Sequence, residues 1–259
     1  MIGVVSRSPI TLQTAAERLG VHYQTAYQWV RSGRLRAQRI RGRYQLDPDD
    51  VERLARNRAR PAPRRVRRPR GGFAKLAERA YDALVDGDER SLRDLVDRLT
   101  TDGTRMTTAA QEVLAPAMQR IGTDWHDGVV TIADEHRASA IVERVLGDHS
   151  PNPRGRRRGT VVVVALSGER HALPTSMAAL ALREDNWHVH HLGADLPRQE
   201  LFRFCREHKV DLVVLTTTTN ATRTAAHECA EDLRRLGVRA LVGEPGDTLT
   251  ELQRRARNP

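Results

Sequence analysis

The sequence predicts a multidomain protein that contains a winged helix-turn-helix domain, a four-helix bundle and an α/β domain with a parallel sheet. Three observations predict this class. Near the N-terminus, short helical patterns are followed by an alternating hairpin pattern, whereas four longer helical patterns fill the middle. Toward the C-terminus, apolar strands alternate with helices. Basic, proline-containing breaks separate these parts, so we place domains at residues 1–55, 73–150 and 159–259, with a linker over 56–72.

The first domain is expected to consist of short helices and one small hairpin. Thr11 is a good N-cap for an amphipathic helix that ends at Gly20, and a second helix is expected over about Gln24–Arg31. Beyond it, apolar and polar residues alternate around a glycine turn, which is typical of a β-wing. Pro48 then suits the first position of another helix.

The chain has 259 residues and a formal net charge of +10, which favours a polyanionic partner. No apolar run approaches the ~18 residues of a membrane span, and residues 1–10 lack the apolar core of a signal peptide. We therefore expect a cytoplasmic, nucleoid-associated bacterial protein that binds no membrane. The two cysteines, Cys205 and Cys229, form no Cys-x-x-Cys pair, so neither a disulfide scaffold nor a cysteine zinc site is expected.

A helix-turn-helix unit can place its second helix in the major groove of double-stranded DNA. Side chains near the start of that helix are then predicted to be exposed and to face base edges: Tyr23, Gln24, Thr25, Tyr27 and Gln28. Arginines on either side are predicted to contact phosphates: Arg31, Arg34, Arg39, Arg41 and Arg43.

The run from Thr11 to Leu54 resembles the winged-helix DNA-binding domain of MerR-type and excisionase-type proteins. The resemblance rests on the segments AAERLGV, AYQWVRSGRL and RGRYQLDPDDVERL. It implies a transcription regulator that binds a double-stranded DNA operator. A small helical module that binds protein instead is the alternative.

The stretch from Arg56 to Arg70 contains eight arginines, three prolines and no acidic residue. Proline disfavours a helix and like charges repel one another, so we predict an extended linker here. The linker is either a solvated spacer or a source of further phosphate contacts.

In the helical middle domain, a chemically dense corner separates the third helix from the fourth. It contains Trp125, His126, Glu135 and His136, and Thr131 is expected to cap the fourth helix. An aromatic ring, a carboxylate and two imidazoles could therefore lie together at the opening of one binding site. A core tryptophan with polar surface neighbours is the simpler alternative.

From Gly159 onward the pattern predicts a Rossmann-like, flavodoxin-like domain, with ligands at the carboxyl ends of its strands. The loop after the first strand, Thr160–Leu166, has no glycine-rich phosphate motif, but it contains Glu169 and His171. A neutral imidazole can ligate a transition metal such as cobalt, and a carboxylate can hold its other nitrogen. A lone loop histidine is more often simply exposed.

Across essentially its full length, the chain resembles the cobalamin-binding, light-sensing repressors of the CarH/LitR type. In that family an Asp/Glu-x-His-x-x-Gly loop supplies the lower ligand of cobalt, which makes His171 the ligand here and Glu169 its partner. The segment His190–Pro197 resembles the second strand and loop of corrinoid-binding domains.

The family also has a Trp-x9-Glu-His pattern over the upper corrin face, and Trp125, Glu135 and His136 match its spacing. By resemblance, His126 would ligate cobalt after light breaks the cobalt–carbon bond. The implied cofactor is adenosylcobalamin. The implied assembly is a homo-oligomer, a dimer or tetramer, that binds DNA in the dark and dissociates in light.

Three positions depart from the family pattern. Pro174 replaces the glycine of the loop motif, and the Ser-x-Leu after the third strand is Thr216-Thr217-Thr218. Thr216 keeps a hydroxyl as a predicted cofactor contact. Thr218 stands where the family has a leucine, so the apolar surface against the nucleotide tail of the cofactor is lost there. Gly243 remains a predicted contact, but Glu244 puts a carboxylate where close approach favours glycine.

Three functions follow as hypotheses: a light-responsive cobalamin repressor, a corrinoid enzyme subunit, or a regulator whose degenerate sensor responds to another ligand or a protein. The DNA-binding domain argues against the enzyme, and we assign no catalytic residue. The altered residues after the third and fourth strands make the degenerate sensor the main alternative.

Overall fold

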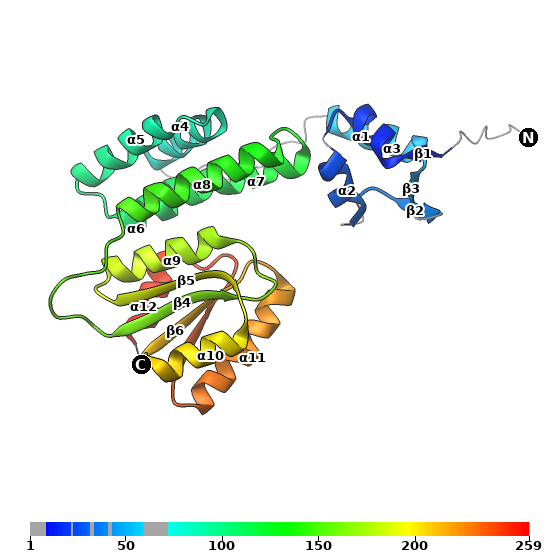
Figure 1. Ribbon diagram of the computed structural model, residues 1–259. Coiled ribbons are helices and arrows are strands. Elements are labelled where there is room, and N and C mark those ends of the chain that lie inside the picture. Colours follow the sequence, from blue (N-terminus) through cyan, green and yellow to red (C-terminus); the bar gives the residue numbers. More distant parts are fainter. Residues whose placement is uncertain (1–8, 22, 32–33, 41–42, 60–71, 259) are drawn as a thin grey trace, which may run out of the picture.

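The computed structural model describes residues 9–21, 23–31, 34–40, 43–59 and 72–258, which form three domains in chain order (Figure 1). The N-terminal domain combines three helices with a small antiparallel sheet of order β1-β3-β2. Its elements are β1 (Ile10–Thr11), α1 (Leu12–Leu19), α2 (Tyr23–Arg31), β2 (Ala37–Ile40), β3 (Arg43–Leu46) and α3 (Pro48–Ala59).

The predicted winged helix-turn-helix is confirmed in this domain. The Thr11 hydroxyl accepts a hydrogen bond from the backbone N–H of Thr14 at 3.2 Å, and Gly20 ends α1 in the left-handed region with φ 64°. The expected wing is the β2–β3 hairpin. Trp29 and Leu35 lie fully inside the domain core.

The predicted start of the linker at residue 56 is wrong, because α3 continues to Ala59. Proline constrains only itself and the residue before it, so the arginines that precede Pro61 remain free to be helical. Arginine and alanine are good helix formers, and cations are favourable near a helix C-terminus. Residues 60–71 of the predicted linker lie outside the described residues, and Gly72 already begins the next helix.

The middle domain is the predicted four-helix bundle. Its third helix is assembled from three consecutive segments, of which η1 is π-helical. The Thr131 hydroxyl and the Asp134 carboxylate cap the fourth helix reciprocally, as expected. The elements are α4 (Gly72–Asp86), α5 (Glu89–Thr101), α6 (Met106–Ala109), η1 (Ala110–Leu114), α7 (Ala115–Asp127) and α8 (Ile132–Asp148).

The C-terminal domain has a four-stranded parallel sheet of order β5-β4-β6-β7. Helices α9 and α12 pack on one face, and α10 and α11 pack on the other. This is the predicted doubly wound class. The elements are β4 (Thr160–Leu166), α9 (Ala172–Glu184), β5 (His188–Leu196), α10 (Arg198–Glu207), β6 (Leu212–Thr216), α11 (Asn220–Arg235), β7 (Arg239–Gly243) and α12 (Leu249–Arg257).

The strand order reverses around β4, because the chain moves from β4 outward to β5 and then crosses to β6. At such a switch point, the loops after the two neighbouring strands diverge and leave a crevice at the carboxyl ends of the strands. The loops after β4 and β6 flank that point. We call the ends of the strands on this side the carboxyl edge.

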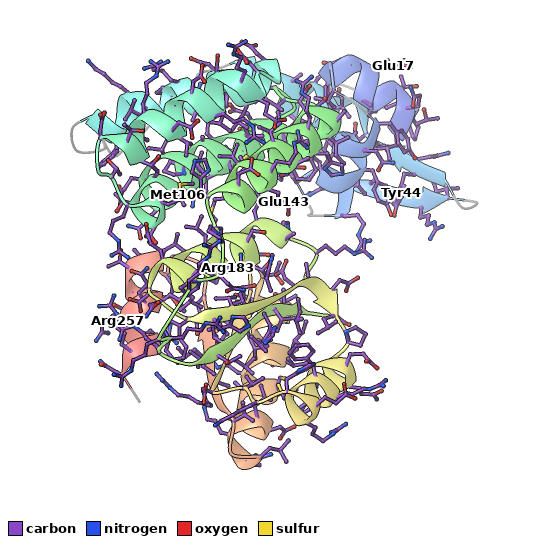
Figure 2. All side chains as sticks on the ribbon, turned by 60° about the vertical axis from the view of Figure 1, so that its left-hand side comes forward. Glu17, Tyr44, Met106, Glu143, Arg183 and Arg257 are labelled. Atoms are coloured by element: carbon purple, nitrogen blue, oxygen red, sulfur yellow. The ribbon has the colours of Figure 1, made fainter. Side chains whose placement is uncertain are left out.

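The bundle is joined to the α/β domain through α9 and α12. The Glu184 carboxylate accepts hydrogen bonds from the backbone N–H groups of Met106 and Thr107 at 2.7 and 3.0 Å. Gln253, only 2% exposed, donates to the Thr107 hydroxyl and to the Ala181 carbonyl. Met106, at this junction, is labelled in Figure 2. These contacts fix the bundle over one face of the sheet.

No helix in the described parts of the chain is long and apolar enough to cross a bilayer.

Candidate functional site

The loop between β4 and α9 carries the predicted pair Glu169 and His171. His171 is the residue immediately before α9, and its side chain is 66% exposed, whereas that of Glu169 is 2% exposed. Nδ1 of His171 lies 2.5 Å from Oε1 of Glu169. The predicted contact between these two side chains is therefore present.

Glu169 is held by a network of donors from the neighbouring strand and helix. Its Oε2 accepts hydrogen bonds from the backbone N–H and the hydroxyl of Thr218, both at 2.7 Å, and from the Thr222 hydroxyl at 2.9 Å. Burial raises the pKa of this carboxyl, but the bonds from Thr218 and His171 outweigh that effect and lower the pKa to about 2. Glu169 is therefore an anion at neutral pH.

An ionised carboxylate beside Nδ1 fixes the state of the His171 ring. Nδ1 carries a proton when it donates to Glu169, so in the neutral tautomer Nε2 is the nitrogen that keeps a lone pair. Among the described residues, no hydrogen bond involves Nε2 of His171. An exposed imidazole nitrogen backed by a buried carboxylate is the donor set suited to one axial site of a transition metal.

The backbone of the loop is braced by β5. The Asp195 carboxylate accepts from the N–H of Gly168 at 2.8 Å, and the N–H of Asp195 donates to the Glu169 carbonyl at 2.9 Å. Asp195 itself has φ 57°, an uncommon conformation for a residue with a side chain. The loop is thus held from β5 as well as from β6.

Thr218 and Thr222 were not predicted to position Glu169. Thr218 was interpreted as a lost apolar wall and Thr216 as the retained hydroxyl, but the hydroxyl that contacts Glu169 belongs to Thr218. The Thr216 hydroxyl is buried and has no hydrogen-bond partner among the described residues. The spacing of Thr219 and Thr222, a reciprocal helix cap, is a sequence signal that places Thr222 at the start of α11.

The departures at Gly243 and Glu244 lie at the end of β7. The Gly243 carbonyl accepts hydrogen bonds from the N–H and the hydroxyl of Thr217 at 3.2 and 3.0 Å. The Glu244 carboxylate turns toward α11, where Nε2 of His227 lies 3.0 Å from it. The bond from His227 and the charge of Arg223 lower the pKa of Glu244.

The four residues of the predicted corner lie at the end of α7 and the start of α8; we call Trp125–His136 the α7–α8 corner. The Trp125 ring packs against the bundle core, and its indole nitrogen is buried without a partner among the described residues. Glu135 accepts from the Ser139 hydroxyl at 2.8 Å and lies 2.7 Å from Nδ1 of His136. His126 and His136 are exposed.

Figure 1 shows the turn between α7 and α8 at the same end of the molecule as the loop between β4 and α9. Both features therefore lie at the end of the molecule that contains the carboxyl edge of the sheet. Within the described residues, no hydrogen bond joins the α7–α8 corner to His171. The expected convergence of Trp125, His126, Glu135 and His136 with the His171 loop on one ligand stays a prediction.

In α2, the expectation of five exposed side chains is wrong for Thr25, which is only 4% exposed. Thr25 lies one turn before the buried Trp29 and shares its inward face. Tyr27 is half-buried and packs edge-on against Tyr44 of the wing, whereas Tyr23 and Gln24 are exposed. The side chain of Gln28 lies outside the described residues.

The predicted phosphate contacts also differ among the arginines. Arg31 and Arg39 are exposed, and the Arg39 guanidinium lies 6.0 Å from the centre of the Tyr44 ring. Arg34 instead forms an ion pair with Asp127 of α7 at 2.9 Å. Arg41 and the side chain of Arg43 lie outside the described residues.

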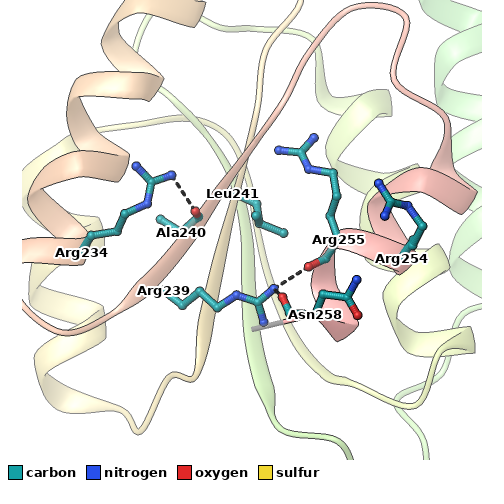
Figure 3. A pocket seen from close by; sticks show the side chains of 7 residues that line it. All are labelled: Arg234, Arg239, Ala240, Leu241, Arg254, Arg255 and Asn258. Atoms are coloured by element: carbon teal, nitrogen blue, oxygen red, sulfur yellow. Dashed lines mark hydrogen bonds between the residues drawn. The ribbon is translucent and has the colours of Figure 1, made fainter.

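A basic depression at the opposite edge of the sheet has a structural explanation (Figure 3). Arg239, the first residue of β7, donates to the carbonyls of Arg255, Ala256 and Asn258, and Arg234 donates to that of Ala240. Cations at the ends of α11 and α12 offset the negative ends of the helix dipoles.

The two thiols are unreactive by environment. Burial, followed by the neighbouring Cys229, raises the pKa of Cys205 to about 11. Burial also raises the pKa of Cys229. Both thiols are free, so the structure has no disulfide between them.

Three family models match separate parts of the chain. Residues 10–59 match the helix-turn-helix domain, and residues 76–147 and 159–256 each match a B12 binding domain. Over 118 residues, 45% of this chain, it is 35% identical to the HTH-type transcriptional repressor CarH of Myxococcus xanthus. The chain therefore combines a helix-turn-helix domain with two B12 binding domains, and it is similar to this repressor over part of its length. This match spans 38% of the repressor's length.

Other relatives are similar to the bundle and the α/β domain of this chain. Trimethylamine corrinoid protein 1 of Methanosarcina acetivorans is 20% identical over 173 residues, which are 65% of this chain and 80% of that protein. The monomethylamine corrinoid protein of Methanosarcina barkeri has a similar structure, with a TM-score of 0.58 and 12% identity, over 72% of this chain and 99% of that one. The bundle and α/β domain therefore share the fold of a corrinoid protein.

Proposed function

We propose that this chain is a DNA-binding repressor of transcription that binds adenosylcobalamin between its bundle and its α/β domain and senses light through it. His171 would hold the lower face of the cobalt through Nε2. When bound, the cofactor would supply a cobalt–carbon bond that light can break. The residues of this chain position the cofactor and convert its state into a change in DNA affinity.

The observation that carries the proposal is the Glu169–His171 pair. A bound cobalamin would bring its own macrocyclic ligands for cobalt, so a single exposed imidazole such as that of His171 would be enough to hold it from the protein side. Glu169 is anchored by Thr218 and Thr222 before any ligand arrives, and it orients the ring and raises the basicity of Nε2.

Support for the upper face comes from the α7–α8 corner. Trp125, packed on the bundle core, supplies an apolar surface, and the Glu135–His136 pair supplies polar groups at the start of α8. His126, exposed beside Trp125, would be a second histidine able to hold the cofactor's cobalt, and we propose it for that role in the illuminated chain. We also propose that the α7–α8 corner would cover the corrin when it is bound.

Glu244 favours one alternative, a regulator whose degenerate sensor takes another ligand or a protein partner. Its carboxylate occupies the carboxyl edge and pairs there with His227 and Arg223. A corrinoid enzyme subunit is the further alternative, because the corrinoid relatives match the same part of the chain.

The test is an absorption spectrum of the purified full chain after incubation with adenosylcobalamin in the dark and removal of free ligand. The wild-type chain is expected to retain the corrin with an imidazole below cobalt. His171→Ala is expected to lose the corrin or to show it without that ligand. His227→Ala, which removes another exposed histidine from the same edge, is the control and is expected to match the wild type.

Green light should then change the spectrum of the wild-type chain irreversibly. If the wild-type chain retains no corrin, the degenerate sensor is the better description. Retention that His171→Ala leaves unchanged in amount and spectrum would contradict the role given to His171.

A further inference from the structure

The DNA-binding domain is docked on the last turn of α7. The indole N–H of Trp29 in α2 donates to the backbone carbonyl of His126 at 2.5 Å. Arg34, which follows α2, donates from Nη1 to the Asp127 carboxylate at 2.9 Å. The Arg34 guanidinium also lies 4.8 Å from the centre of the Trp29 ring. These contacts join segments more than 90 residues apart in the chain.

The contact satisfies two groups that the end of α7 leaves exposed. The carbonyls in the last turn of a helix have no partner within the helix, and Trp29 fills that position at His126. Asp127 is the last residue of α7, where the helix dipole disfavours a negative charge, and the guanidinium of Arg34 offsets it. The end of α7 is thus a surface complementary to the DNA-binding domain.

Arg34, which pairs with Asp127 in this contact, is also predicted to bind a DNA phosphate. Arg34 lies directly after the helix predicted to enter the major groove, where its guanidinium is expected to meet a phosphate. A carboxylate and a phosphate cannot both occupy the same donors at close range. Docked as seen here, the domain has Nη1 of Arg34 bonded to Asp127 and a negative charge beside its recognition helix.

We propose that the Arg34–Asp127 pair is an autoinhibitory contact in which Asp127 competes with DNA phosphate for Arg34. The inference rests on the proposed DNA binding and adds a means of regulating it. Asp127 follows Trp125 and His126, the residues assigned to the upper face of the cofactor. Any ligand that shifts the end of α7 therefore also shifts the partner of Arg34.

The test compares the affinity of the full chain for a mixed-sequence DNA duplex about 30 base pairs long at low salt, because phosphate contacts dominate such binding. Asp127→Asn keeps the size of the side chain and removes its charge. It is expected to bind about twofold to fivefold more tightly than the wild type, the range of a partly exposed ion pair. Asp148→Asn is the matched control, since Asp148 also ends a helix and pairs with an arginine, Arg93.

A double-mutant cycle completes the test. In an Arg34→Ala background, Asp127→Asn is expected to leave DNA affinity unchanged, because the guanidinium for which Asp127 and the phosphate compete is absent. Equal tightening by Asp127→Asn with and without Arg34, or equal tightening by Asp148→Asn, would show a general charge effect and overturn the inference. If all variants bind equally well, the contact does not regulate binding. If none binds DNA, the proposed DNA binding itself fails, and the autoinhibitory role fails with it.

Discussion

Glu169 is the residue on which the proposed site depends. It is buried, ionised and shared between the His171 ring, the Thr218 hydroxyl and backbone, and the Thr222 hydroxyl. A buried carboxylate is stable only when hydrogen bonds replace its water shell. These bonds tie three segments of the carboxyl edge together, so the residue contributes to the stability of the edge as well as to the orientation of the imidazole.

The pH dependence of stability should reveal this carboxylate. Its pKa in the folded chain, about 2, is below the ordinary value of 4.5, so its stabilising effect is complete above pH 4.5 and is lost as the pH falls toward 2. Urea denaturation at several pH values should show Glu169→Gln to be destabilised by about 1–3 kcal/mol at neutral pH. The difference from wild type should shrink in acid.

Glu143→Gln provides the control, because it removes an exposed carboxylate from α8. It should leave the free energy of unfolding near that of the wild type across the same pH series. A Glu169→Gln curve parallel to the wild-type curve from neutral pH to pH 3 would contradict an ionised, buried Glu169.

The sequence predicts the contact between Glu169 and His171, because two residues of separation in one loop keep their side chains within reach. It does not predict Thr218 and Thr222, which are 49 and 53 residues away from Glu169. Their approach depends on β6 being the neighbour of β4, which is a property of the strand order. The identity of the donors to a buried carboxylate thus becomes clear only from the sheet topology.

At the scale of the element, α2 and the wing form the surface proposed to meet DNA. Helical periodicity predicts the length of α2 to within one residue. In the structure, Ala26 and Trp29 form its buried face. The side of the helix on which Thr25 lies was assigned from its position near the N-terminal end, and the packing around Trp29 overrides that argument. The exposed face is consequently narrower than predicted.

Arg39 lies on the exposed side of the wing, so its replacement tests whether the wing contacts phosphate. We expect Arg39→Ala to weaken DNA binding and to reduce the slope of log affinity against log salt concentration by about 0.9, the value for one phosphate neutralised. A salt titration of DNA affinity measures the slope. Arg90→Ala removes an exposed arginine from α5 instead and should leave the slope unchanged.

At the scale of the whole molecule, basic breaks and changes of periodicity separate the three domains in the sequence, although the first break begins inside α3. The contacts between the domains, in contrast, cannot be predicted from such patterns. The bonds from Glu184 to the start of α6 and from Trp29 to the end of α7 join segments 78 and 97 residues apart. No local pattern encodes such pairs, since each depends on the relative placement of complete domains.

The proposed light response belongs to this scale. Loaded with adenosylcobalamin in the dark, the chain is expected to elute as a dimer or tetramer, and after green light as a smaller species. Size-exclusion chromatography with light scattering measures both masses. The His171→Ala chain, treated identically, should show no light-dependent change. If illumination leaves the mass of the loaded wild-type chain unchanged, the proposed change of oligomeric state is wrong. Any light effect would then lie within one subunit.

The junction of the bundle with α9 and α12 has a consequence for engineering. Glu184 and Gln253 bind α6 from inside the α/β domain, and Met177 and Leu180 of α9 belong to the bundle core. Residues 72–258 should therefore be transplanted as one unit when the bundle and the α/β domain are joined to a different N-terminal domain. A chimera that exchanges the bundle alone would place different residues against Glu184 and Gln253. It would need a redesigned interface between α6 and helices α9 and α12 to remain folded.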